Sequence, residues 1–181
     1  MHQTGCYSLG SSPHIPARAF AMRAFTVLSL ACFALTLCLQ ETAVPADPAP
    51  EVAHPNLPAG AGKIDADAPK TFTITPSGLK YRVLRKGTGK MPKVTNTVKV
   101  HYHGWLDDGK KFDSSYDRRE TLESPLNDLI PGWTEGMQLV GEGGMIELEI
   151  PSNLGYGARG APPVIPGNAT LHFLVELIAV R

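Results

Sequence analysis

An aromatic ring and a carboxylate stand side by side in a very polar stretch of the chain, residues 109–119, which reads GKKFDSSYDRR. Phe112 is the only fully apolar residue of this stretch, and Asp113 follows it directly. We interpret the ring and the carboxylate as parts of one small cavity, with the lysines on its outside. The alternative is surface ion pairing of Asp113 and Asp117 with Arg118, an interaction that contributes little to stability.

Two further patterns could do chemistry, but each lacks a necessary partner. His101 and His103 are spaced to share one face of a strand and could ligate a metal, yet no third ligand has a suitable spacing. We therefore expect a solvated strand face and no metal. GEGG at 141–144 lacks the strand–turn–helix setting of a phosphate-binding loop and is interpreted as a turn. No cofactor is predicted.

Composition and charge exclude other classes of protein. The 181 residues have room for one ordinary domain plus appendages, and the formal net charge is zero, which argues against a dedicated nucleic-acid binder. The three cysteines all lie within the first 40 residues, at Cys6, Cys32 and Cys38. The remaining chain therefore has neither a disulfide framework nor a cysteine-based metal site.

The first 46 residues have the pattern of an export signal. Residues 24–39 are apolar or small and uncharged, Arg18 and Arg23 precede them, and small residues follow. The sequence VPAD offers a cleavage point after Ala46. We therefore predict export to the periplasm or cell envelope.

Three questions about this region stay open. Met22 directly precedes the basic and apolar residues, so translation could begin there and residues 1–21 could be a misassigned start. Cys32 or Cys38 could instead carry the lipid of a bacterial lipoprotein. An uncleaved membrane anchor is the third alternative.

Residues 47–70 are rich in proline and alanine. Such a composition buries little surface, so we predict a flexible, extended linker here. The folded domain is expected over residues 71–181.

Within that domain, alternation of apolar and polar residues predicts strands around 79–83, 98–106, 146–150 and 171–177, with a hairpin turn at 107–109. One apolar and one mixed face is typical of an antiparallel sheet covered on one side. Helical spacing occurs once, at Ile130, Trp133, Met137 and Val140. The sequence therefore predicts an α+β domain in which one short helix covers the apolar face.

Residues 152–169 have no period, and so long a loop in a small domain is usually functional or disordered. Tyr156, Val164 and Ile165 argue against disorder, because they are residues suited to covering something.

Four motifs, in this order and spacing, resemble the FKBP-type peptidyl-prolyl cis/trans isomerases. They are VHYHGWLDDGKKFDSS, IPGWTEGM, GYGARG and PGNATLHFLVEL, and the resemblance covers residues 71–181. It implies a five-stranded antiparallel sheet wrapped around one short helix, with the substrate cavity between them. It also implies rotation of X-Pro bonds in exported proteins, without metal or cofactor.

The resemblance also assigns roles to residues. Trp133 matches the cavity floor, Asp113 its polar residue, and Arg118 the basic side chain packed nearby. The catalytic set that it implies is Tyr102, Phe112, Asp113, Trp133, Tyr156 and Phe173. The substrate-binding set is Arg118, Leu122, Leu129, Ile130, Ala161, Val164 and Ile165. The hydroxyls of Tyr102 and Tyr156 and the backbone N–H of Ile130 are candidate donors to substrate carbonyls.

Two departures from the family pattern affect the rim. Ala161 stands where eukaryotic members often have histidine, and Leu122 and Ser124 lie where aromatic residues are common. These differences put peptide preference and macrolide inhibitor binding in doubt.

The predicted partners are proline-containing polypeptides, and a monomer is expected. A non-catalytic proline-binding module and a general folding chaperone are the alternatives. The chaperone would favour an inserted flap or an added helical module, for which residues 71–181 have no space.

Overall fold

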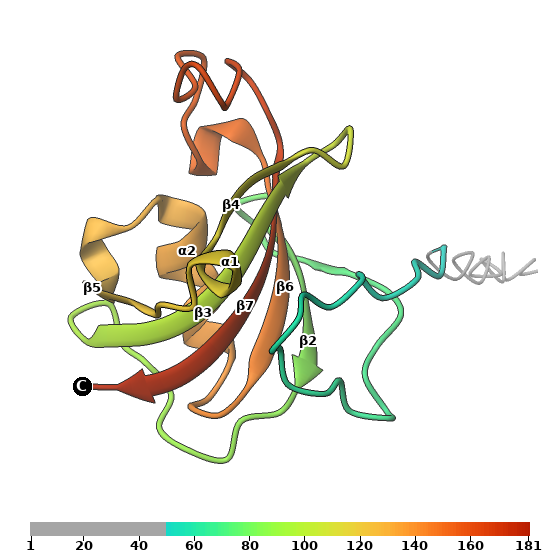
Figure 1. Ribbon diagram of the computed structural model, residues 1–181, viewed down its shortest axis with the longest axis vertical. Helices are drawn as coiled ribbons and strands as arrows, with labels where there is room; N and C mark the ends of the chain where they lie inside the picture. The colour runs from blue at the N-terminus through green and yellow to red at the C-terminus, as the bar shows by residue number, and fades with distance from the viewer. Residues whose placement is uncertain (1–49) are drawn as a thin grey trace, which may run out of the picture. The chain divides into compact units, whose positions relative to one another are not determined.

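The structure is a computed structural model, and it describes residues 50–181. The predicted export signal, Met22 and the cysteines lie outside the described residues. The described chain forms one antiparallel sheet with short helices against it (Figure 1). Its strands are β1 (Thr73–Ile74), β2 (Lys80–Arg85), β3 (Thr97–Leu106), β4 (Lys111–Ser114), β5 (Leu122–Pro125), β6 (Met145–Ile150) and β7 (Leu171–Val180).

The sheet runs in the order β1-β2-β6-β7-β3-β4, and β5 also pairs with β3. The prediction of an antiparallel α+β fold is confirmed, but the sheet has seven strands rather than five. The extra count arises at the sheet edges. β1 is only two residues long, and the free edge of β3 is paired by two separate short strands, β4 and β5.

Between β4 and β5 the chain leaves the edge of β3 and forms α1 (Ser115–Arg118). Arg119 closes this single turn in the left-handed conformation, with φ of 54°, and its N–H donates to the Tyr116 carbonyl over 3.0 Å. The sequence analysis did not predict this helix. Four residues are too few to show a helical period, so α1 had no signal in the pattern of apolar residues.

The predicted helix is α2 (Pro131–Gly136), which continues as the 3₁₀ turn η2 (Met137–Leu139). Pro131 occupies the first turn, as predicted. The two glycines of α2 allow it to lie very close to β6. A Cβ at Gly132 would lie 2.5 Å from Ile150 Cγ2, and one at Gly136 would lie 2.6 Å from Leu148 Cδ2. The remaining 3₁₀ turns are η1 (Leu126–Asp128) and η3 (Ser152–Leu154).

The inner face of the sheet holds the core, and strict alternation along β3 buries every second residue, as predicted. The outer face differs from the prediction, because residues 50–70 lie against it instead of forming a free linker (Figure 1). The side chain of Arg82 is fully buried there and pairs with Glu147 over 2.7 Å.

The same guanidinium donates to the carbonyls of Val52, Ala53 and Lys70 over 2.6, 2.7 and 3.2 Å. Further along the segment, Ala61 and Ile64 pack on a small apolar cluster of Leu84, Met145 and Leu174. The proline-rich composition correctly indicates a segment without a core of its own. The composition does not show that Arg82, a buried arginine twelve or more residues later in the chain, binds the backbone of this segment.

Across the described residues, the structure contains no helix with the length and apolar character that crossing a membrane requires.

Candidate functional site

A cavity of about 340 Å³ lies between α2, the inner face of the sheet and the loop that precedes β7. Every predicted site residue except Arg118 lines it. The lining residues are Tyr102, Phe112, Asp113, Leu122, Leu129, Ile130, Trp133, Tyr156, Ala161, Val164, Ile165 and Phe173. The structure therefore brings these residues together around one cavity, and their catalytic and binding roles stay predictions.

Four aromatic rings pack against one another in the wall of the cavity. Trp133 at the start of α2 is 4 % exposed, and its ring meets Tyr102 and Phe173 edge-on, with centroids 5.5 and 5.2 Å apart. Phe112 from β4 meets Phe173 in the same manner at 5.3 Å. Such edge-to-face pairs are favourable arrangements that hold each ring in place, so the cavity has rigid apolar walls.

Gly104 lies directly beneath these walls, on the inward face of β3. A Cβ at this position would lie 2.6 Å from Phe112 Cζ and 2.9 Å from Phe173 Cε1. A glycine on the buried face of a strand often marks such a close approach. The rings of Phe112 and Phe173 therefore occupy the space that a side chain at position 104 would take.

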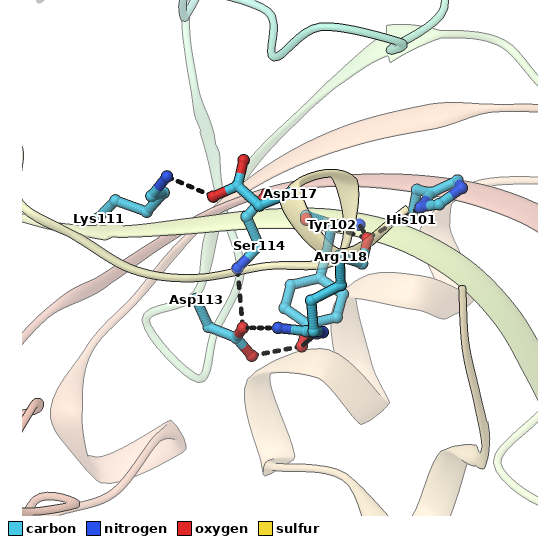
Figure 2. Close-up of polar contacts among 8 residues, drawn as sticks. His101, Tyr102, Lys111, Asp113, Ser114, Asp117 and Arg118 are labelled. Atoms are coloured by element: carbon cyan, nitrogen blue, oxygen red, sulfur yellow. Dashed lines mark hydrogen bonds and ion pairs between the residues drawn. The ribbon is translucent and has the colours of Figure 1, made fainter. Parts of the chain in front are cut away.

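The polar corner of the cavity is a hydrogen-bonded triad, shown in Figure 2. The Tyr102 hydroxyl donates to Asp113 Oδ2, and the Arg118 guanidinium donates to Asp113 Oδ1 and, over 2.8 Å, to the Tyr102 oxygen. Arg118 thus lies at the rim, behind Asp113. The carboxylate of α1, Asp117, pairs with Lys111 on the side away from the cavity.

Electrostatics favour the ionised form of Asp113. Partial burial would raise the pKa of its carboxyl group, but hydrogen bonds from Tyr102 and Arg118 outweigh burial and lower it below the ordinary value. The pKa of Tyr102 is raised, first by burial and then by its bond to Asp113. Asp113 is therefore a carboxylate and Tyr102 a neutral phenol at neutral pH.

This triad corrects the expectation that Tyr102 donates to a substrate carbonyl. A phenol has one hydrogen to donate, and that of Tyr102 goes to Asp113. The other two candidate donors stay free of this conflict. Tyr156 is 43 % exposed at the cavity mouth. The N–H of Ile130 precedes α2, where a helix leaves its first N–H groups without intrahelical partners.

Ser115 holds the backbone of Tyr102 from α1. Its fully buried hydroxyl accepts from the Tyr102 N–H over 2.8 Å and lies 3.2 Å from the Tyr102 carbonyl oxygen. This hydroxyl bridges the gap along β3 between the end of β4 and the start of β5. A serine at this position, directly after Ser114, gives no sign of that role in the sequence.

The histidines lie differently from the expectation of a solvated face. His101 stacks on Tyr116, with centroids 4.8 Å apart, and both His101 and His103 are half-buried. Burial lowers the pKa of His103. Among the described residues there is no group of three His, Cys, Asp or Glu side chains that could hold a metal ion.

The mouth of the cavity is open and partly apolar. Tyr156 and Val164 are 43 % and 41 % exposed, and both come from the loop between β6 and β7. A short bridge between Ala161 and Ile165 shapes this loop, with the Ala161 N–H donating to the Ile165 carbonyl over 2.9 Å. On the opposite side, Leu122 from β5 is half-buried. The cavity that Trp133 lines is therefore open to solvent at this mouth.

A second cavity, of about 460 Å³, lies on the outer face between β3, β6 and the segment 50–56. Its wall includes Trp105, which stacks on His172 at 5.6 Å. Only the inner cavity combines the predicted aromatic residues with Asp113.

Comparison with known proteins agrees with this geometry. The model of the family described as "FKBP-type peptidyl-prolyl cis-trans isomerase" matches residues 88–178. The chain is 56 % identical over 107 residues to the FKBP-type peptidyl-prolyl cis-trans isomerase FkpA of Aeromonas hydrophila, covering 59 % of this chain and 40 % of that protein. It is 50 % identical over 112 residues to FkpA of Escherichia coli K12, covering 62 % and 41 %.

Solved structures give the same picture. The crystal structure of FkpA from Escherichia coli matches with a TM-score of 0.59 at 48 % identity, covering 61 % of this chain and 51 % of that chain. AtFKBP13 matches with a TM-score of 0.58 at 34 % identity, covering 61 % and 99 %. The matched region spans less than half the length of the curated relatives named above.

Proposed function

Because the chain belongs to the FKBP-type peptidyl-prolyl cis-trans isomerase family, we propose that its inner cavity catalyses rotation about X-Pro bonds in polypeptides. The observation that carries this proposal is the cavity itself. Rigid aromatic rings around Trp133 and one carboxylate, Asp113, surround a space of about 340 Å³ that is open to solvent.

The chemistry required is conformational. An X-Pro bond resists rotation with a barrier of about 18–20 kcal/mol, because the amide nitrogen shares its lone pair with the carbonyl group. The twisted transition state loses this resonance and has less charge separation than the planar amide. An apolar cavity therefore destabilises the planar form relative to the twisted one, and only such preferential binding of the transition state accelerates the reaction. An acceleration of about 10⁵-fold requires roughly 7 kcal/mol of this preference.

The residues divide this work. Trp133 supplies the flat surface for the prolyl ring, and Phe112 and Phe173 exclude water from the rotating bond. Tyr156 and the Ile130 N–H donate to carbonyl groups of the substrate and hold the peptide on both sides of the proline. Asp113 orients the substrate, while the carboxylate is itself held by Tyr102 and Arg118.

A binding module that holds prolyl peptides without turnover is the main alternative. Two measurements on one peptide separate the two functions: the affinity for a Leu-Pro tetrapeptide and the rate of its cis-to-trans conversion in a protease-coupled assay. We expect kcat/KM above about 10⁴ M⁻¹ s⁻¹, in the range typical of enzymes. Saturable binding without acceleration would establish the binding module instead.

We further propose that the protein acts outside the cytoplasm on unfolded or partly folded exported proteins. The basic and apolar pattern of residues 1–46 supports export. A general chaperone is less well supported, because the longest helix among residues 50–181 is the six-residue α2, so this part of the chain contains no added helical module. We also propose a monomer. Macrolide inhibitors are proposed to bind the same cavity, and Ala161 and Leu122 at its rim are expected to weaken that binding.

A further inference from the structure

Helix α1 has one side toward the candidate site and the other toward the outer face of the sheet. On the site side, Ser115 bonds to the Tyr102 backbone and Arg118 bonds to Asp113 and to the Tyr102 hydroxyl. One four-residue helix, α1, therefore orients both Asp113 and Tyr102, the two members of the triad that line the cavity (Figure 2).

A single helical turn does not hold itself in place, because the first turn of a helix is costly to form and gains few hydrogen bonds. The orientation of α1 must come from side chains that anchor it. Tyr116 and Ser115 are its two buried residues. Arg118 and Asp117 are about half exposed, so they do not fix the helix.

Tyr116 is anchored on the outer face by a buried carboxylate. Its hydroxyl donates to Glu176 Oε2 over 2.9 Å, and the two residues are 8 % and 9 % exposed. Glu176 also accepts from the Arg85 guanidinium and, over 3.3 Å, from the Gly62 N–H. This carboxylate is thus a fixed point that joins α1, β2, β7 and the N-terminal segment.

The titration behaviour of the pair agrees with a permanent bond. Burial, followed by the charge of Glu176, raises the pKa of the Tyr116 phenol far above its ordinary value. Burial would raise the pKa of Glu176, but the bonds from Arg85, Tyr116 and Gly62 outweigh it and lower it. The donor and the acceptor therefore keep their roles over the whole physiological range of pH.

We propose that Tyr116 is a positioning residue: its hydrogen bond to Glu176 holds α1 in the orientation that places the Arg118 guanidinium on Asp113 and Tyr102. The proposal rests on the proposed isomerase function for its kinetic consequence only. Tyr116 does not line the cavity and would not touch the substrate. We propose that its effect on catalysis passes through Arg118, the α1 side chain that contacts Asp113.

The test is Tyr116→Phe, which keeps the ring stacked on His101 and removes only the hydroxyl. Two results are expected. The pKa of Asp113, followed by the ¹³C NMR shift of its carboxyl carbon, rises toward the ordinary value because the Arg118 contact is loosened. In addition, kcat/KM for a prolyl peptide falls by about three- to tenfold.

A double-mutant cycle shows whether the effect passes through Arg118. In an Arg118→Ala background, Tyr116→Phe is expected to cause no further loss of kcat/KM. Asp117→Asn is the matched control, because it removes an exposed ion pair from the same helix on the side away from the cavity. It should change neither the Asp113 pKa nor kcat/KM.

Glu176→Asp is the second variant. It keeps the negative charge near Arg85 but withdraws the carboxylate by one methylene from the Tyr116 hydroxyl, so the same two changes are expected even if Tyr116→Phe folds poorly. The proposal is overturned if the Asp113 pKa stays at its wild-type value in the folded variants, or if Tyr116→Phe retains its full effect without Arg118. Absence of isomerase activity in the wild type would refute the proposed function, and the Asp113 titration would still decide the positioning role.

Discussion

Gly104→Ala adds one methyl group beneath the aromatic wall of the cavity and should damage function more than its size suggests. The new Cβ would lie 2.6 and 2.8 Å from Phe112 Cζ and Cε2, and 2.9 Å from Phe173 Cε1. Carbon atoms pack at about 3.5–4.0 Å, so a ring must move by about 1 Å. Both rings line the cavity, but Phe173 is almost fully buried against Trp133 and Tyr102, whereas Phe112 is only half-buried. We therefore expect the Phe112 ring to move, into the space where the substrate is proposed to bind.

The substitution should lower both the stability of the fold and the rate of catalysis. Overpacking of this kind destabilises a fold by about 1–3 kcal/mol, which for a domain of this size lowers the melting temperature by about 3–12 °C. A displacement of about 1 Å in a positioning group lowers catalysis by up to about a hundredfold. We therefore expect kcat/KM on a prolyl tetrapeptide to fall by about ten- to a hundredfold, measured at a temperature where the variant remains folded.

Gly109→Ala, in the turn that joins β3 to β4, is the control. Gly109 has a φ of 78° and open space around its Cβ, so alanine strains the backbone there without touching the cavity. It should lower the melting temperature by several degrees and leave kcat/KM within about twofold of wild type. The packing argument is refuted if Gly104→Ala matches Gly109→Ala in both measurements.

Three other perturbations test separate parts of the structure. Arg82→Met leaves Glu147 buried without its partner and should lower the free energy of unfolding by about 3–5 kcal/mol, measured by urea denaturation. Because burial already raises the pKa of Glu147, this loss of stability should shrink at low pH, where the carboxyl group is protonated. A loss of stability that grows at low pH would contradict this. The lowered pKa of Asp113 predicts that kcat/KM stays level as the pH falls from about 7 to about 4, near the ordinary Asp value. Asp113→Asn should lower kcat/KM by less than a hundredfold. An apparent pKa above about 4 in the pH profile of wild-type kcat/KM would argue against the triad. Tyr156→Phe should raise KM about three- to tenfold with little change in kcat, because a neutral hydrogen bond contributes about 1 kcal/mol. An unchanged KM would exclude the Tyr156 hydroxyl as a donor to the substrate.

The inner face of the molecule could be predicted because local rules determine it. Alternation along residues 98–106 and helical spacing after Pro131 each require only neighbouring residues. The aromatic cavity residues and Asp113 come from four motifs whose order and spacing resemble one family. The sequence analysis therefore named Trp133, Phe173 and Asp113 together, and the structure places them around one cavity.

The outer face could not be predicted, because contacts between distant residues determine it. Arg82 reaches the backbone at Val52, thirty residues away, and Glu176 accepts from Gly62 across 114 residues. Backbone carbonyls have no sequence signature, so a proline-rich segment held by an arginine has the same composition as a free linker. The hydroxyl of Tyr102 illustrates the same limit, since its choice of Asp113 as acceptor depends on a short helix that the periodicity did not reveal.

The two tryptophans of the chain offer the most direct test of the central claim, that the aromatic cavity favours the twisted prolyl bond. Trp133 forms the floor of the inner cavity, and Trp105 lies on the outer face. The measurement is kcat/KM for a Leu-Pro peptide, obtained by NMR exchange without a coupled protease, for Trp133→Leu and Trp105→Leu. The account predicts at least a tenfold loss for Trp133→Leu and a change of less than about twofold for Trp105→Leu, a difference of about 1 kcal/mol or more in transition-state binding. Equal losses in the two variants, or an unchanged rate in Trp133→Leu, would contradict it.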